Sequence, residues 1–183
     1  MSVAKPLRPG IVRDLPFIAV GVGAGTMAAV GVAMIAAVGR KRGGEEATWL
    51  HMTTLIAGTA AVLAIAALRG KHPGFLRPLD RAWAMWAIAG SFAALALMSV
   101  RGIAPYYLLS GLSSVAIFLL LAWLVVRVNL AFYFAATTLG QVFGSLVMDE
   151  IGAFGAAERE FTLLRALGVV LVAAGVVVVR TAK

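Results

Sequence analysis

Charged residues in this chain are confined to short breaks between long apolar runs. Five runs carry no charged residue at all, and they cover 15–39, 47–68, 82–100, 102–126 and 128–148. A helix needs about 20 apolar residues to cross roughly 30 Å of hydrocarbon, and a run of 18 or more is a candidate span. A sixth run, 161–179, also qualifies if Arg165 extends its guanidinium to the membrane surface. The pattern predicts a polytopic membrane protein.

The pattern predicts an all-α transmembrane bundle of six helices that forms a single integral membrane domain over residues 1–183. We place the helices near 16–39, 48–69, 82–100, 104–127, 129–149 and 162–180. Only Arg127, Val128 and Asn129 separate the fourth helix from the fifth. Joined, the two would form one helix of about 70 Å, more than twice the hydrocarbon thickness. We therefore predict an antiparallel hairpin that turns at Arg127 to Asn129.

The composition leaves no room for a soluble domain. Hydrophobic residues make up 62% of the chain and charged residues 13%, against about 25% charged residues in ordinary soluble domains. The longest polar stretch between runs, 69–81, has the length of a loop. We interpret the net charge of +8 as basic residues at helix ends facing lipid headgroups. The lipid bilayer is therefore an expected partner, and nucleic acid is not.

The basic residues predict the orientation if the chain crosses six times. Cytoplasmic segments of membrane proteins carry an excess of Lys and Arg. One side would hold ten basic residues and the other six, which favours both termini in the cytoplasm. The ten are Lys5, Arg8, Arg13, Arg69, Lys71, Arg77, Arg81, Arg127, Arg180 and Lys183, and the six are Arg40, Lys41, Arg42, Arg101, Arg159 and Arg165.

The fifth segment holds the strongest candidates for a substrate site. Thr137, Gln141 and Ser145 recur every four residues, so they share one helix face. Beside them, Gly140 and Gly144 form a GxxxG ridge of the kind that lets helices approach closely. An unpaired amide in hydrocarbon costs several kcal/mol, so Gln141 must face a partner helix or a wet cavity. A structural hydrogen bond between helices and a substrate contact both satisfy this requirement.

The fourth segment offers a polar face that could lie opposite. Tyr107, Ser110 and Ser114 are spaced at i, i+3 and i+7, although single serines in membrane helices often bond only to their own backbone. In the first segment Gly21 and Gly25 form another small-residue ridge, which we interpret as a packing surface.

No carboxylate lies in the middle of a predicted span. Asp149 ends the fifth segment, where it is either a coupling acid at a cavity mouth or a solvated helix end. His51 is the titratable residue within a run; a histidine pKa of about 6.5 suits proton exchange, but a headgroup-level position is the alternative. The chain contains no cysteine, and His72 is its second and last histidine. Because no catalytic constellation lies within the spans, we expect no enzyme activity, metal or cofactor.

The C-terminal half resembles a known family. Residues 130–149 form an apolar helix with a small residue before Gln141 and a Met-Asp ending, and Gly152, Gly155 and Arg165 follow in the last loop and helix. This pattern is similar to the YdcZ-type small members of the drug/metabolite transporter superfamily. Residues 106–128 resemble the preceding helix, and 16–70 resemble the opening pair more loosely.

The resemblance implies a bacterial inner-membrane helical bundle that moves small molecules. The small members of the superfamily have five spans, about half the helices of its ten-helix transporters, and are expected to pair. Gln141 carries over as the motif residue and Asp149 as the second. Residues 81–102 look like an inserted sixth span relative to this pattern.

We therefore expect a small-molecule transporter, an exporter or permease-like protein that acts as a homodimer or with a homologous membrane partner. Residues 107–114 and 137–145 would line its path. The alternative is a non-transporting membrane subunit that packs against and stabilises a partner protein. A hydrated cavity that reaches Gln141 would favour the transporter, whereas a solid core would favour the subunit.

Overall fold

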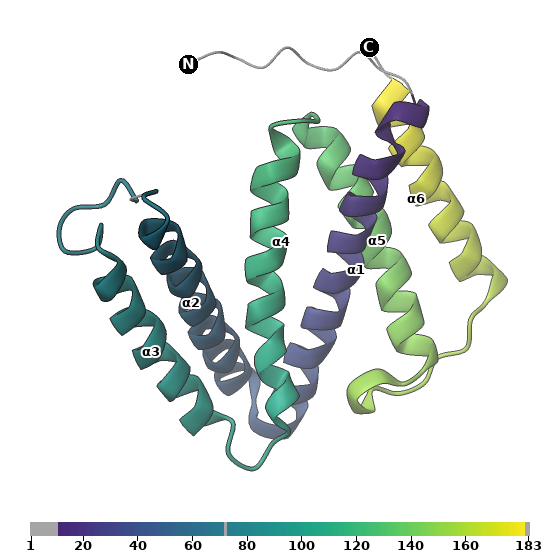
Figure 1. Cartoon of the computed structure of the whole chain (residues 1–183). Helices are drawn as coiled ribbons and strands as arrows, with labels where there is room; N and C mark the ends of the chain where they lie inside the picture. The colour runs from purple at the N-terminus through teal and green to yellow at the C-terminus, as the bar shows by residue number, and fades with distance from the viewer. Residues whose placement is uncertain (1–10, 72, 182–183) are drawn as a thin grey trace. The chain divides into compact units, whose positions relative to one another are not determined.

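The computed structural model describes residues 11–71 and 73–181, and within them the regular secondary structure is helical, with loops between the helices and no strand (Figure 1). Lys5, Arg8, His72 and Lys183 lie outside the described residues. The all-α class and the six helices are confirmed. These helices are α1 (Ile11–Arg42), α2 (Gly44–Leu68), α3 (Ala82–Ser99), α4 (Leu109–Val125), α5 (Leu130–Glu150) and α6 (Leu163–Thr181), with two short 3-10 turns, η1 (Pro105–Leu108) and η2 (Ala153–Gly155).

Five of the described helices are long and apolar enough to cross a bilayer. Their candidate spans are Leu15–Arg42, Gly44–Leu68, Ala82–Ser99, Pro105–Val125 and Leu130–Glu150. The apolar part of α6, Leu163–Val179, is shorter than these five and falls near the lower limit of about 17 residues for a spanning helix. The third helix, whose residues look like an insertion in the sequence, is among the five.

The first two helices are joined by a single residue. The sequence pattern predicts a loop from residue 40 to 47, but α1 continues to Arg42 and α2 begins at Gly44. Gly43 makes the turn with a φ of 95°, a conformation that glycine adopts without steric cost. Glu45 and Glu46 then lie in the first turn of α2, where negative charge is favourable beside the helix N-terminus. Charged residues therefore extend both helices instead of breaking them.

The chain divides into two compact units. The first unit contains Met1–Ala33 and Ala116–Lys183, and the second contains Met34–Val115. Both α1 and α4 therefore contribute residues to each unit.

In the first unit, glycines let α1 and α5 pack backbone to backbone. A Cβ added at Gly25 would overlap the carbonyl oxygen of Thr137, and one at Gly140 would overlap the carbonyl of Val22. The Thr26 hydroxyl donates a hydrogen bond to the Gly140 carbonyl at 3.2 Å. The glycine ridges of the first and fifth segments, which the sequence shows separately, are thus the two sides of one contact.

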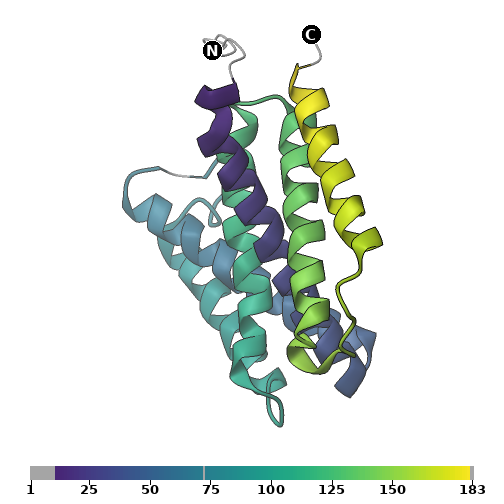
Figure 2. The ribbon, with the colours of Figure 1, turned by 90° about the vertical axis from the view of Figure 1, so that its right-hand side faces the viewer.

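The predicted hairpin between the fourth and fifth helices is confirmed. After α4 ends, the backbone N–H groups of Arg127 and Val128 donate to the Leu124 carbonyl at 2.8 and 2.9 Å. Asn129 then caps α5 by accepting the N–H of Phe132 at 2.7 Å. Figures 1 and 2 show α5 lying beside α6. The apolar cluster at this end of the unit includes Leu124, Val128, Phe132, Tyr133 and Val176.

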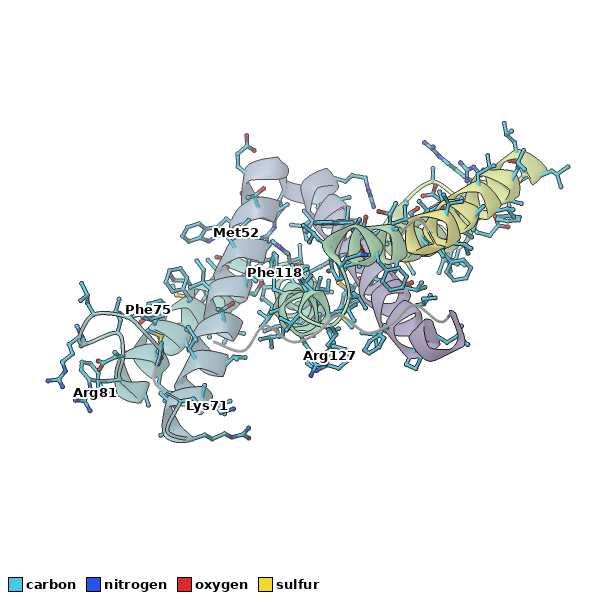
Figure 3. All side chains as sticks on the ribbon, turned by 90° about the horizontal axis from the view of Figure 1, so that it is seen from above. Met52, Lys71, Phe75, Arg81, Phe118 and Arg127 are labelled. Atoms are coloured by element: carbon cyan, nitrogen blue, oxygen red, sulfur yellow. The ribbon has the colours of Figure 1, made fainter. Side chains whose placement is uncertain are left out.

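In the second unit, α2 packs along α3 and against the first residues of α4. Gly111 allows this approach, because a Cβ there would overlap the Thr54 hydroxyl and come within 2.6 Å of the Leu55 nitrogen. The loop between α2 and α3 carries Lys71, Phe75 and Arg81 (Figure 3). The two basic residues among them, Lys71 and Arg81, lie close to the ends of α2 and α3, as the charge pattern predicts.

Candidate functional site

The first unit contains an open groove of about 420 Å³ between α1 and α5, which we call the α1–α5 groove. Such a volume falls within the range of small-molecule sites, which combine apolar walls with a few polar groups. The α5 wall supplies the polar groups of this groove. The residues that line it are Ala28, Ala29, Val32 and Ala33 of α1 and Gln141, Val142, Ser145, Met148 and Asp149 of α5.

Close helix packing lies directly beside the groove. A Cβ at Gly144 would come within 3.0 Å of the Ala29 side chain and 3.1 Å of the Thr26 backbone. The small Ala28 and Ala29 side chains leave space on α1 where larger residues would fill it. The same small residues therefore bring the helices together and leave the groove open.

Gln141 and Ser145 are the uncharged polar groups of the groove. Both side chains are exposed, and they lie one helical turn apart on α5. The Ser145 hydroxyl donates to its own helix, to the Val142 carbonyl at 2.9 Å, which leaves its oxygen able to accept. The Gln141 amide has two donor hydrogens and an acceptor oxygen. Together they offer hydrogen bonds to a molecule that enters the groove.

Asp149 lies one turn beyond Ser145 on α5 and forms an ion pair with Arg165. Its carboxylate lies 3.7 Å from the guanidinium of Arg165 in α6, and both side chains are partly exposed. The sequence suggested a coupling acid or a solvated helix end for Asp149, and it did not indicate this partner. The pair also gives the charge inside the sixth apolar run a counter-ion, although a partly exposed pair contributes little stability.

Thr137 lies apart from the groove, although it shares the helix face of Gln141 by spacing. It is buried, and its hydroxyl donates to the carbonyls of Tyr133 and Phe134 at 3.0 and 3.1 Å. The close approach of Gly25 covers this turn of α5. Periodicity assigns a face, but the neighbouring helix decides which part of that face stays open.

The second unit brings His51 together with two of the predicted serines. The Nδ1 atom of His51 lies 3.4 Å from the Ser110 hydroxyl, and its Nε2 atom lies 3.5 Å from the Ser114 hydroxyl. Ser114 also donates to the Ser110 carbonyl at 3.3 Å. A neutral imidazole can donate from one nitrogen and accept at the other, so both contacts suit rotatable hydroxyls. The sequence shows His51 and these serines only as separate candidates.

Tyr107 is packed inside the second unit. Its side chain is buried, its ring lies under the Lys41 ammonium at 5.5 Å, and it contacts the Tyr106 ring with a centroid distance of 4.5 Å. Each unit therefore holds its own group of predicted residues, one around Gln141 and one around His51. In the part of the chain that the structure describes, no three His, Asp or Glu side chains form a group that could hold a metal ion.

A family model described as "Putative inner membrane exporter, YdcZ" matches residues 83–178. Because the match covers more than half of the chain, the chain belongs to this family. It is a multi-pass inner-membrane protein, and the resemblance of its C-terminal half is confirmed. One expectation is corrected: the match includes nearly all of α3, so residues 81–102 are not an insertion, and the residues outside the matched range hold α1 and α2. Curated proteins and solved structures give no match.

Proposed function

We propose that the chain moves a small molecule across the inner membrane along the α1–α5 groove. The observation that carries this proposal is the exposed amide of Gln141. This residue belongs to an apolar helix that is long enough to span the membrane, and its side chain lines an open groove. Hydrocarbon offers an amide no hydrogen-bond partner. A cargo with its own donor and acceptor would supply that partner, and the family of inner-membrane exporters supports the same function.

The walls of the groove define the class of cargo. Alanine and valine side chains of α1 and Val142 and Met148 of α5 give it apolar surfaces. The amide of Gln141 and the hydroxyl of Ser145 provide two neighbouring uncharged hydrogen-bonding groups. This combination favours a compact molecule with an apolar body and a polar edge.

Coupling of transport to protons would not use a carboxylate in the middle of the membrane. Glu45 and Glu46 lie in the first turn of α2, while Asp149 and Glu150 end α5. We therefore propose uniport, or coupling that uses another ion or a group near a helix end. Asp149 and His51 are the residues to test for such a role.

We also propose that the chain crosses the membrane six times as one domain, with both termini in the cytoplasm. The excess of ten basic residues over six supports this orientation. The shorter helix α6 can cross if Arg165 lies at the membrane surface beside Asp149, as the 3.7 Å ion pair at the end of α5 allows.

Pairing of two copies is part of the same proposal. It rests on the resemblance to small superfamily members with about half the helices of the ten-helix transporters. Cross-linking in native membranes tests it: a covalent dimer is expected, and a monomer at every cross-linker length would contradict it.

Uptake of a panel of radiolabelled or fluorescent cargoes into proteoliposomes, with and without a pH gradient, tests the function. Gln141→Leu should reduce uptake of an active cargo at least tenfold, because a buried polar partner on the cargo loses its hydrogen bond. Thr138→Leu is the matched control, since Thr138 is exposed on α5 but does not line the groove. Stably inserted wild-type protein that transports none of the panel would instead favour a non-transporting subunit.

A further inference from the structure

A second cavity, of about 300 Å³, lies in the second unit where α1 ends, α2 begins and α3 ends. Its lining combines charged, aromatic and apolar side chains. We call it the Arg42 cavity, and its residues are Val38, Arg42, Glu46, Trp49, Leu50, Met98, Ser99, Arg101 and Ile103. None of these residues belongs to the proposed transport path.

The Arg42 guanidinium is held in place by the end of α3. One terminal nitrogen donates to the Ser99 carbonyl at 2.7 Å, and the other donates to the Arg101 carbonyl. Glu46 lies 3.6 Å away. A guanidinium has five N–H donors, so this anchoring leaves donors for a ligand. An arginine fixed in this way loses little conformational entropy when it binds an anion.

Arg101 adds a second positive charge to the cavity. Its side chain is exposed, and no salt bridge to it is found among the described residues. With Glu46 as the single acidic lining residue, the cavity carries an excess of positive charge. Arg40 and Lys41, in the last turn of α1, increase this excess nearby. The local charge therefore favours an anionic ligand.

The rest of the lining is suited to the membrane interface. Trp49 donates from its indole nitrogen to the Ser99 hydroxyl at 3.1 Å and remains half exposed. Tryptophan prefers the headgroup level, where one part of its ring is apolar and one polar. Met98 and Ile103 provide an apolar edge. The candidate spans end at Arg42 and Ser99 and begin at Gly44, so the cavity lies at the boundary of the hydrocarbon.

From these observations we propose that the Arg42 cavity binds the phosphate of an anionic phospholipid headgroup. Arg42 and Arg101 would contact the phosphate oxygens, since guanidinium groups match phosphate geometry. Met98 and Ile103 would contact the glycerol and the first methylenes. The volume is at the lower end of ligand sites, which fits a headgroup and not a whole lipid. This site does not depend on the proposed transport function.

Native mass spectrometry of the full chain in nonionic detergent tests this site. Phosphatidylglycerol should form bound adducts, whereas phosphatidylcholine should bind several-fold more weakly because its choline cation meets the basic side chains. Arg101→Gln should weaken phosphatidylglycerol binding about tenfold, the loss expected for one charge-assisted hydrogen bond. This substitution keeps the Arg101 carbonyl that accepts from Arg42, so thermal stability without added lipid should not change.

Arg159→Gln is the matched control, because Arg159 is an exposed arginine outside the cavity. It should bind phosphatidylglycerol as the wild type does. Equal losses for the two variants, or no loss for Arg101→Gln, would overturn the proposal. Glycerol 3-phosphate provides the other arm: if it binds as tightly as the lipid and displaces it, the ligand is a soluble phosphate compound and the lipid assignment is wrong.

Discussion

Asp149 and His51 are titratable residues near the ends of apolar helices, and each contacts side chains of a second helix. Arg165 pairs with Asp149 from another helix, and His51 meets Ser110 and Ser114 through the packing of α2 on α4. Spacing within one helix predicts a face, but it carries no information on which residue of another helix lies opposite. The burial of Thr137 has the same cause.

Coupling of transport to protons would depend on single titratable residues. Substrate-driven proton flux should be absent both from wild-type liposomes and from those with the Asp149→Asn, His51→Gln double variant, while cargo still crosses. The reason is that the spans hold no carboxylate away from their ends. The measurement is the internal pH of the liposomes during uptake.

Two results would contradict uniport. Proton flux abolished by Asp149→Asn alone would assign coupling to the Asp149–Arg165 pair. Flux that survives both substitutions would require a proton carrier other than Asp149 and His51.

The lengths of the helices are predictable from the sequence, whereas the connections between them are predictable only in part. The α4–α5 hairpin followed from the total length of two apolar runs, which no bilayer can accommodate as one helix. The one-residue connection at Gly43 was missed, because a charged stretch with two glycines also has the composition of a loop. Residues Glu45 and Glu46 are compatible with either structure, and their favourable position at the start of α2 appears only once the turn is known.

The contact of α1 with α5 gives a sharp prediction about glycine. Gly25→Ala should destabilise the protein by about 1–3 kcal/mol, because its Cβ would overlap the Thr137 carbonyl and the helices must separate. Thermal unfolding in detergent measures this effect. The fraction of protein that still elutes as a monodisperse peak in size-exclusion chromatography is recorded after heating to each temperature.

Gly23→Ala is the control on the same helix. Nothing lies within 4 Å of the position of its Cβ, and alanine is a better helix former than glycine. Its stability should be equal to or slightly above that of the wild type. If Gly25→Ala is as stable as Gly23→Ala, α1 and α5 do not pack as described.

For the molecule as a whole, the pattern of apolar runs is sufficient to predict a polytopic membrane protein. The six helices and their membrane environment follow from the length and hydropathy of the runs. Both predictions hold even where the predicted helix ends are wrong by several residues. The groove and the Arg42 cavity were not predictable in this way. Both depend on small residues and helix ends from different parts of the chain that meet only after folding.

The orientation is testable with reporter fusions. Fusions after residue 75 and at the C-terminus should both report the cytoplasm, because an even number of spans lies between them in a six-span chain. The basic residues of the α2–α3 loop and of the C-terminus favour this side. Opposite locations would show an odd number of spans, with α6 as the helix that fails to cross.

Thiol modification during transport tests the α1–α5 groove most directly, because the chain contains no cysteine. A cysteine in place of Ser145 would line the groove, whereas one in place of Thr138 would lie on α5 outside it. Thiols react as thiolates, which form in water and not in hydrocarbon. A charged methanethiosulfonate reagent should therefore label Ser145→Cys and stop cargo uptake into proteoliposomes, and excess cargo should slow the labelling. Thr138→Cys should remain unlabelled and active. Complete labelling of Ser145→Cys with unchanged uptake, or no labelling at all, would contradict a substrate path through this groove.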